Sequence, residues 1–234
     1  MINILLLAGN TLRSRAYAQK LNELTGVSIS GLFLGVHKKE CHVPGLNDAT
    51  LQYLVENDIS VPNFKKCLVT TFSENQWAYQ LSETIDVNSI EVLEAIKNQN
   101  IDLIIFSGYG GQILNENHFL GDTPYLHMHP GDLPSERGST TLYYSILKQQ
   151  NCAVTAFFMN KEIDAGELIC CNKYPIPNKN VNIDYYLDNC LRSDCLETAI
   201  GQIKNNRRIQ KNDSSNDYYI IHPLLKHLAI LSLK

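Results

Sequence analysis

The first eleven residues, which read MINILLLAGNT, decide the class of fold. Residues 2–7 form a nearly continuous apolar run, which is typical of a parallel strand that is buried on both faces. A glycine turn follows at Gly9, and apolar residues then recur with helical spacing from Ser14 to Leu24. A second strand is expected over Val27–Val36. This order of strand, turn, helix and strand predicts an α/β protein with a doubly wound sheet.

The rest of the chain continues the alternation of strands and helices. We expect a weak strand at 64–72 and further strands at 102–107, 125–129, 154–159 and 166–174. Helices are expected at 49–56, 86–99, 115–120, 140–148 and 183–203, the second capped by Asn88 or Ser89. The pattern predicts a Rossmann-like open, mostly parallel, twisted sheet flanked by helices, with a short C-terminal extension. We place one domain over residues 1–204, a mobile polar linker over 205–216, and a tail to Lys234 that packs back on the domain.

The composition of the chain excludes several classes of protein. Of the 234 residues, 44% are hydrophobic and 19% are charged, which is enough to bury a sizeable core. The net charge of −4 argues against a surface-wide basic field for nucleic acid. The seven cysteines are odd in number and form no C-x-x-C motif, so we expect neither a disulfide framework nor a zinc site.

Localisation is predicted from the same features. The N-terminal apolar run lacks the basic flank of a signal peptide, and no apolar run reaches the roughly 18 residues that a membrane helix needs. Reduced thiols are typical of the cytoplasm. We therefore expect a cytoplasmic protein whose partner is a small-molecule substrate, with no nucleic acid and no membrane. Homo-oligomerisation stays open.

Two histidines stand at the end of the strand expected over residues 125–129. His127 and His129 are two residues apart, so their side chains project to the same face of that strand. Pro130-Gly131 ends the strand directly afterwards. Ligands and catalytic groups gather at strand ends of open α/β sheets. We interpret the pair as part of a catalytic site.

Metal binding is the alternative interpretation of these histidines, because H-x-H is a spacing of metal ligands. A third ligand would have to come from Asp132, Asp164 or a cysteine, and none is clear from the sequence. A second loose cluster, formed by His37, Cys41 and His42, is no stronger. We therefore predict no metal.

Two further motifs carry charged groups. Asp164 stands before Ala165-Gly166, in the loop between the last two expected strands. It either caps a turn or acts as a general base or electrostatic partner for a histidine. Arg137 offers a fixed cation, and Ser139 or Thr140 is expected to cap the helix that follows.

Two glycine turns follow buried strands. Backbone N–H groups at Gly9–Thr11, before the first helix, offer a site for an anion, and Arg13 and Arg15 would add charge-assisted contacts to a phosphate. The residues match neither G-x-G-x-x-G nor a P-loop, so a plain structural turn and a substrate-phosphate contact both stay open. Gly108–Gly111 makes either a tight turn or a close backbone approach to a flat ligand.

These motifs together resemble a known family, the 10-formyltetrahydrofolate-dependent formyltransferases. The chain contains, in the family's order, Ile104–Leu114, Leu126-His127-Met128-His129-Pro130, Leu133-Pro134, Arg137-Gly138, Val154-Thr155 and Ile163-Asp164-Ala165-Gly166. The superfamily includes glycinamide ribonucleotide formyltransferase, methionyl-tRNA formyltransferase and the sugar N-formyltransferases. The resemblance covers roughly residues 1 to 200. It implies the formyltransferase type of α/β fold, with residues 1–204 as the catalytic domain.

The resemblance also implies a catalytic site of three side chains. His129 corresponds to the family's histidine and Asp164 to its aspartate, whereas His127 stands where the family has an asparagine. An imidazole N–H can also donate a hydrogen bond to a developing oxyanion. The implied reaction transfers a formyl group from 10-formyltetrahydrofolate, the co-substrate, to a primary amine.

The same resemblance implies which residues bind the two substrates. The folate is expected against residues at the end of one strand and in one loop: Ile104, Phe106, Gly108, Tyr109, Gly110, Gln112, Asn160 and Ile163. The formyl acceptor is expected against the first turn and the residues that follow the histidines: Gly9, Asn10, Thr11, Arg13, Arg137, Ser139 and Thr140.

A nucleotide-linked amino sugar is the acceptor that the sequence favours. The motif H-x-H-P-G, with Arg137–Thr141 and Tyr143–Ser145, is most similar to the branch that formylates such sugars, including the pseudaminic-acid pathway type. About 30 residues follow the last long helix, too few for the C-terminal barrel of methionyl-tRNA formyltransferases. The Gly9 turn lacks the serine-rich phosphate loop expected for glycinamide ribonucleotide.

Two other classes of protein are weighed against this one. A non-catalytic folate- or nucleotide-binding module is suggested by the histidine at position 127. An NAD-dependent dehydrogenase is disfavoured because the glycine fingerprint of dinucleotide binding is missing.

Overall fold

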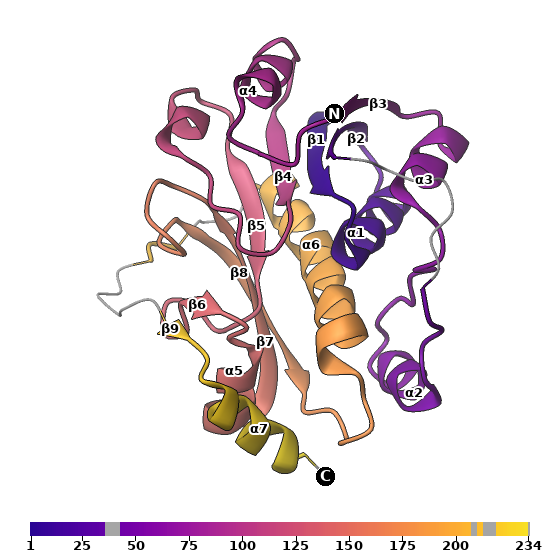
Figure 1. The fold of residues 1–234 in the computed structure, drawn as a ribbon, viewed down its shortest axis with the longest axis vertical. Coiled ribbons are helices and arrows are strands. Elements are labelled where there is room, and N and C mark those ends of the chain that lie inside the picture. Colours follow the sequence, from indigo (N-terminus) through magenta and orange to yellow (C-terminus); the bar gives the residue numbers. More distant parts are fainter. Residues whose placement is uncertain (36–42, 207–209, 213–218, 234) are drawn as a thin grey trace. The chain divides into compact units, whose positions relative to one another are not determined.

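A computed structural model of the chain describes residues 1–35, 43–206, 210–212 and 219–233 (Figure 1). Its main sheet has seven strands in the order β3-β2-β1-β4-β5-β7-β8. The pairs from β3 to β5 are parallel and the pair β7–β8 is antiparallel, which confirms the predicted α/β class. The chain forms two compact units, Met1–Gly45 with Pro62–His127, and Leu46–Val61 with Met128–Lys234.

The first unit holds the parallel strands. They are β1 (Ile2–Gly9), β2 (Val27–Leu34), β3 (Ala78–Ser82), β4 (Leu103–Ser107) and the first part of β5 (Tyr125–His129). Its helices are α1 (Leu12–Glu23), α3 (Leu68–Glu74), α4 (Ile90–Lys97) and a 3₁₀ turn, η1 (Glu116–Phe119). Every residue of β4 is buried, as expected for a parallel strand with both faces covered.

Two helices of the first unit begin at side-chain caps. The hydroxyl oxygen of Thr11 accepts a hydrogen bond from the N–H of Ser14 at 3.1 Å, which starts α1 directly after the β1 turn. Ser89 caps α4 in the same way and is one of the two caps predicted for that helix. The helix itself is shorter than the predicted 86–99 because residues 86–89 form a turn before it.

The strand predicted over residues 64–72 is wrong. Residues 68–74 form the helix α3, and the missing edge strand is β3, which the sequence did not indicate. Leu68, Val69 and Phe72 are buried on one side of α3, with the ring of Phe72 at 4.9 Å from that of Phe33. Their β-branched and aromatic character suits a strand equally well in a short window, so helix and strand cannot be told apart locally.

The second unit holds an antiparallel hairpin and most of the later helices. Its strands are β6 (Gly138–Ser139), β7 (Asn151–Phe158), β8 (Leu168–Pro175) and β9 (Tyr219–Ile220). Its helices are α2 (Asp48–Glu56), α5 (Leu142–Gln149), α6 (Asp188–Lys204) and α7 (Pro223–Leu231), and one π-helical turn, η2 (Ile183–Leu187), leads into α6. Helix α6 packs along β7 and β8, as Figure 1 shows.

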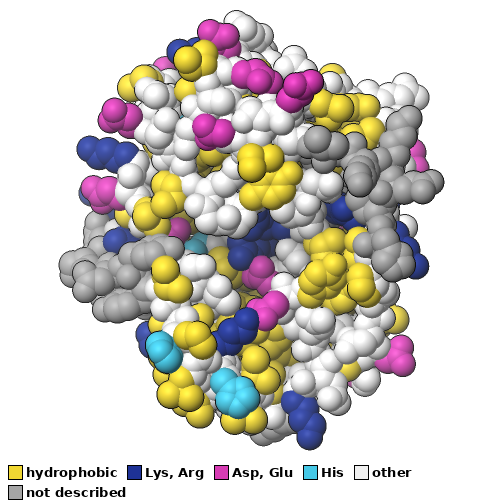
Figure 2. All heavy atoms as spheres, in the orientation of Figure 1, with side chains coloured by type: hydrophobic (Ala, Val, Ile, Leu, Met, Phe, Trp, Pro, Cys, Tyr) yellow, Lys and Arg dark blue, Asp and Glu magenta, His cyan; other side chains and the backbone are white. Residues whose placement is uncertain are grey.

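The last residues of the chain contact the second unit. Strand β9 pairs with β6, and α7 packs against α5 with Ala229 buried between them. The opposite side of α7 exposes Leu224, Leu228 and Leu231, and Figure 2 shows hydrophobic and histidine side chains together over this helix. Part of the predicted linker, 207–209 and 213–216, lies outside the described residues, and the domain boundary after residue 204 stays a prediction. Within the described part of the chain, no helix is both long and apolar enough to cross a membrane.

Candidate active site

Strand β5 carries both predicted histidines and ends at the second of them. The end of this strand is held from behind by α6: the guanidinium of Arg192 donates a hydrogen bond to the carbonyl oxygen of Met128 at 3.1 Å. Arg192 is itself held by the carboxylate of Asp188 at 2.9 Å. A buried cation on a long helix thus fixes the position of the residue directly before His129.

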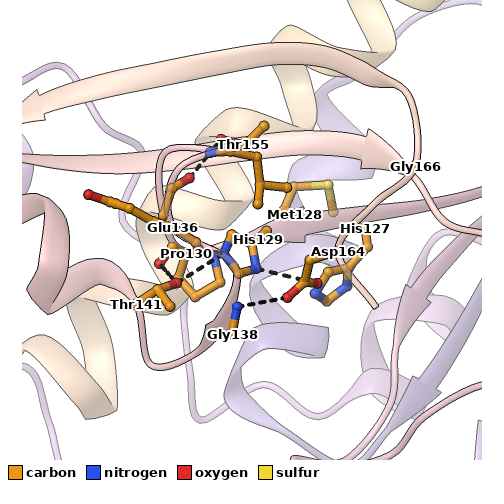
Figure 3. A network of polar contacts seen from close by, with 12 residues as sticks. His127, Met128, His129, Pro130, Glu136, Gly138, Thr141, Thr155, Asp164 and Gly166 are labelled. Atoms are coloured by element: carbon orange, nitrogen blue, oxygen red, sulfur yellow. Dashed lines mark hydrogen bonds and ion pairs between the residues drawn. The ribbon is translucent and has the colours of Figure 1, made fainter. Parts of the chain in front are cut away.

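The imidazole of His129 is buried and held on one side by two oxygen atoms (Figure 3). Its Nε2 lies 2.6 Å from the carbonyl oxygen of Glu136 and 3.0 Å from the hydroxyl of Thr141. That hydroxyl donates its own proton to the carbonyl oxygen of Pro130 at 2.6 Å, so toward His129 it can only accept. Nε2 therefore carries the ring proton, and Nδ1 of neutral His129 is the acceptor.

Asp164 faces the other nitrogen of this ring. Its Oδ1 lies 3.6 Å from Nδ1 of His129, and its Oδ2 accepts a hydrogen bond from the N–H of Gly138 at 3.0 Å. The carboxylate comes from the loop between β7 and β8, and Figure 3 shows it pointing toward the imidazole. The structure thus brings together two of the three predicted catalytic side chains, while their catalytic role stays a prediction.

Burial and charge act on His129 in opposite directions. Desolvation lowers the pKa of His129 below its ordinary value, and this is the largest effect. The nearby carboxylate of Asp164 raises that pKa and Arg192 lowers it, and the net shift is downward. Near neutral pH the ring is therefore neutral, with an unshared pair on Nδ1 directed at the carboxylate side of the site.

His127 belongs to the first unit and is only half-buried. Its Nδ1 lies 3.4 Å from the carbonyl oxygen of Phe106 on the neighbouring strand, with the two rings tilted at a centroid distance of 6.0 Å. Along β5 it is two residues from His129, so the alternation of the strand gives both side chains the same face.

Glu136 is a residue of the site that the sequence did not single out. Its carboxylate is buried, where Oε2 accepts hydrogen bonds from the N–H of Asp132, at 2.9 Å, and from the hydroxyl of Ser145. Burial raises the pKa of this carboxyl. These bonds close the turn whose carbonyl oxygen holds His129. In the sequence, Glu136 is only a charged residue within the Leu133–Gly138 block. A glutamate there is equally well explained by a position on the protein surface.

The helix cap predicted at Ser139 or Thr140 is wrong. Thr141 is the residue before α5, and no side chain bonds to the first N–H groups of that helix. Thr141 has helical backbone angles rather than the extended ones of a capping residue, and its hydroxyl is used at Pro130 and His129 instead. Ser139 is exposed, and Thr140 has a positive φ of 60°. Arg137 donates a hydrogen bond to the side-chain oxygen of Asn212 at 3.1 Å.

In the first unit, the two predicted glycine turns meet. A Cβ at Gly9 would lie 2.9 Å from the ring of Tyr109, so the ring packs directly on the β1 turn. Arg13 donates hydrogen bonds to the hydroxyl of Ser107, at 3.2 Å, and to the carbonyl of Gly108. Asn10 accepts from the buried guanidinium of Arg15 at 3.1 Å. The predicted acceptor-binding and folate-binding residues of this unit are therefore neighbours.

The remaining predicted folate residues differ in exposure. Ile104 and Phe106 lie within β4 and are buried. Gly110 is exposed, and the side-chain oxygen of Gln112 accepts a hydrogen bond from the N–H of Tyr109 at 2.7 Å. In the second unit, Asn160 and Ile163 are exposed in the β7–β8 loop that carries Asp164.

No group of three or more histidine, cysteine, aspartate or glutamate side chains in the described ranges is arranged to hold a metal ion. The loose cluster of His37, Cys41 and His42 lies outside the residues that the structure describes.

Comparison with known proteins was made for both sequence and fold. No family model matches the chain. The methionyl-tRNA formyltransferase of Sulfurovum sp. (strain NBC37-1) is 31% identical over 108 residues, which are 46% of this chain and 34% of that protein. The match thus spans about a third of the relative's length.

Solved structures give a wider match. A phosphoribosylglycinamide formyltransferase from Anaplasma phagocytophilum aligns over 94% of this chain and 99% of its own, with a TM-score of 0.59 and 12% identity. An N-formyltransferase from Helicobacter canadensis, in complex with folinic acid and dTDP-3-aminofucose, aligns over 94% and 71%, with a TM-score of 0.57 and 19% identity. The chain has the formyltransferase fold.

The formyltransferase fold is shared by enzymes that act on different acceptors. Structures named for glycinamide ribonucleotide and for sugar substrates align with this chain at similar TM-scores. The resemblance read from the His-Pro, Leu-Pro, Arg-Gly and Asp-x-Gly motifs is confirmed. The formyltransferase fold alone does not select among the acceptors.

Proposed function

We propose that this protein is an N-formyltransferase that moves a formyl group from 10-formyltetrahydrofolate to the primary amine of a nucleotide-linked amino sugar. One observation carries the proposal. In a formyltransferase fold, a buried neutral imidazole at the end of β5 has its free nitrogen 3.6 Å from the carboxylate of Asp164. The sequence match to a methionyl-tRNA formyltransferase supports a formyl-transferring enzyme.

The reaction needs a proton to be moved. 10-Formyltetrahydrofolate supplies an activated formyl group, whose bond to N10 is exchanged for a bond to the acceptor amine. The amine loses one proton in this exchange and N10 gains one. His129 accepts the amine proton at Nδ1, because its other nitrogen is held in the protonated form by Glu136 and Thr141. Asp164 stabilises the resulting imidazolium, and His129 then releases the proton toward N10.

Charge also develops on the formyl oxygen during the attack. A hydrogen-bond donor directed at that oxygen lowers the barrier. His127 is the residue we assign to this role, since it shares a strand face with His129 and, by the resemblance, stands at the position of the family's asparagine.

The turn after β4 fits the folate co-substrate. No heavy atom lies within 4 Å of a Cβ built at Gly110 or Gly111, so the backbone there is open to a flat ring. Ile85 and Ile113 are 63% and 60% exposed and lie next to this turn, because Gln112 donates a hydrogen bond to the carbonyl of Ile85. Exposed apolar side chains beside free backbone groups suit a planar heterocycle with polar edges.

A sugar nucleotide is the acceptor we favour. The net charge of −4 disfavours a polyanionic tRNA, and the Helicobacter canadensis structure is one of a formyltransferase holding a dTDP-linked aminosugar. Glycinamide ribonucleotide is the second candidate acceptor, since a phosphoribosylglycinamide formyltransferase aligns equally well.

A mass-spectrometric screen tests both acceptor and reaction. The wild-type protein is incubated with 10-formyltetrahydrofolate and a panel of nucleotide-linked amino sugars, with glycinamide ribonucleotide and methionyl-tRNA as further arms. We expect one amino sugar to gain a single formyl group, with release of tetrahydrofolate followed by absorbance. If only glycinamide ribonucleotide or only methionyl-tRNA gains a formyl group, that molecule is the acceptor and the sugar is not. Binding of the substrates without transfer of the formyl group would indicate a non-catalytic module.

Two variants test the assigned chemistry. His129→Ala and Asp164→Asn should each lower kcat by a factor of about 100 to 10,000, because the proton acceptor or its counter-ion is lost. Asparagine at 164 still offers an oxygen to the N–H of Gly138, so this variant should fold normally. His227→Ala, which removes an exposed histidine from α7, is the matched control and should keep wild-type turnover. Full turnover in both site variants would refute the assignment.

A further inference from the structure

A short segment after α6 crosses the loop that carries Asp164. We call residues 210–212 the strap. Gln210 forms both backbone hydrogen bonds of an antiparallel bridge with Leu168, at 2.8 and 2.9 Å. Leu168 is the first residue of β8, directly after the loop. The strap is therefore paired with the second unit by a single β-bridge at the end of the loop.

Asn212 uses both ends of its side-chain amide. Its Nδ2 donates hydrogen bonds to the carbonyl oxygens of Asp164, at 2.9 Å, and of Gly166, at 3.1 Å. Its Oδ1 accepts a hydrogen bond from Nη2 of Arg137 at 3.1 Å. One half-buried amide thus links the backbone of the Asp164 loop to the segment that follows His129.

The conformation of this loop requires such support. Asp164 has a φ of +52°, in the left-handed region that residues other than glycine rarely adopt. At Gly166 the loop passes so close to β7 that a Cβ would lie 1.6 Å from the carbonyl oxygen of Phe158. Strained backbone of this kind persists only where its surroundings hold it. Asn212 holds the carbonyls at both residues.

We propose that Asn212 is a positioning residue for Asp164: through its two carbonyl contacts it keeps the carboxylate against His129. The inference rests on the proposed function for its catalytic consequence. The contacts form a closed ring, in which Arg137 holds Asn212, Asn212 holds the backbone of Asp164, and Gly138, the neighbour of Arg137, holds the carboxylate. Loss of the Asn212 side chain removes the contact to the backbone of Asp164 and leaves the contact of its carboxylate with Gly138.

Displacement of Asp164 should lower the pKa of His129. The charged groups that act on this ring are Asp164 and Asp188, which raise its pKa, and Arg192, which lowers it. If Asp164 moves away from Nδ1, the raising effect weakens while Arg192 and Asp188 stay in place on α6. The pKa of His129 then falls further below its ordinary value.

Asn212→Ala and Asn212→Leu test the proposal, the second because leucine fills a similar volume without polar atoms. The first readout is the pKa of His129 in the full chain without substrates, followed by NMR of ¹³C-labelled histidine. We expect this pKa to fall in both variants. The second readout is formyl transfer, for which we expect kcat to drop about tenfold with the KM for the folate changed less than about twofold.

Lys211→Ala, at an exposed neighbour in the strap, is the control and should match the wild-type protein in both readouts. An unchanged His129 pKa in both Asn212 variants would overturn the proposal, even if turnover fell, because a purely structural role predicts that result. A wild-type protein that transfers no formyl group would refute the proposed function, whereas the NMR titration would still decide whether Asn212 holds Asp164 at His129.

Discussion

At the scale of single residues, Glu136 shows how a buried carboxyl group can hold a neighbouring residue of the candidate site, His129, in place. Its backbone carbonyl oxygen fixes the proton of His129, and its side chain fixes the turn that places this carbonyl. Burial of the carboxyl disfavours its charged form, so the turn is held by a group that is costly to ionise. An amide of the same shape would offer an oxygen without that cost.

Glu136→Gln tests this balance. Because burial raises the pKa of Glu136 in the folded state, the wild-type protein loses stability as pH rises through that folded-state pKa. The glutamine variant lacks this loss. Relative to wild type, the free energy of unfolding of Glu136→Gln should therefore increase as pH rises above the ordinary glutamate pKa of about 4.5, over the range in which the carboxyl ionises in the unfolded chain but not in the folded one.

Urea unfolding of both proteins across this range is the measurement, and the difference between them cancels the contribution of all other titrating groups. Glu162→Gln, at an exposed position of the β7–β8 loop, is the matched control and should show a difference that does not change with pH. A Glu136→Gln difference that falls with rising pH would contradict the buried-charge account.

At the scale of elements, the β7–β8 connection shows why a glycine is needed two residues after Asp164. The loop must turn back on β7, and the N–H of Phe158 donates to the carbonyl of Glu167 at 2.9 Å as the hairpin closes. At Gly166 the backbone lies so close to β7 that there is no room for a side chain. The Asp-x-Gly spacing thus places the candidate catalytic carboxylate two residues before the glycine that lets the loop turn back on β7.

Gly166→Ala should destabilise the protein strongly, by about 3 kcal/mol or more, because its Cβ would collide with a backbone oxygen rather than with a movable side chain. Gly201→Ala is the matched control: it lies within α6 and has no heavy atom near its Cβ position. That change should stabilise by about 0.5 to 1 kcal/mol, since glycine is a poor helix former. Thermal and denaturant unfolding distinguish the two. Equal stability of the two variants would show that the loop accommodates a side chain.

At the scale of the whole molecule, two buried histidines link stability to pH. His118 in the first unit bonds to the hydroxyl of Tyr125 and the carbonyl of Val87, and burial lowers its pKa as it does that of His129. Both are neutral in the folded state, whereas both take up protons in the unfolded chain below the ordinary histidine value of about 6.5. Protonation therefore favours unfolding.

As pH decreases from about 7.5 to about 5.5, each histidine should lower the free energy of unfolding by at most about 1.4 kcal/mol per pH unit, against the opposite contribution of Glu136. The histidine contribution is read from the melting temperatures of histidine variants compared with the wild-type protein. His118→Gln and His129→Gln should each flatten this dependence. His227→Gln, at an exposed histidine of α7, should leave it unchanged. His118→Gln and His129→Gln variants whose pH dependence equals that of the wild-type protein would contradict this account of the two rings.

Local patterns determined much of this protein. The apolar runs at 2–7 and 102–107 and the spacing of His127 and His129 predicted β1, β4 and β5 because burial and strand alternation follow directly from side-chain order. Phe64–Phe72 was wrong because the same residues suit a strand or a helix, and only their contact with β2 and β3 selects the helix α3.

The sequence by itself determined the α/β alternation, the residue types of the candidate site and the order in which they occur along the chain. Only the tertiary structure decided that Glu136, Thr141 and Asn212 hold this site, and that Ser139 and Thr140 do not cap α5. The physical reason is separation along the chain: Asn212 meets Asp164 across 48 residues, and no local periodicity records a hydrogen bond made between segments that only folding brings together.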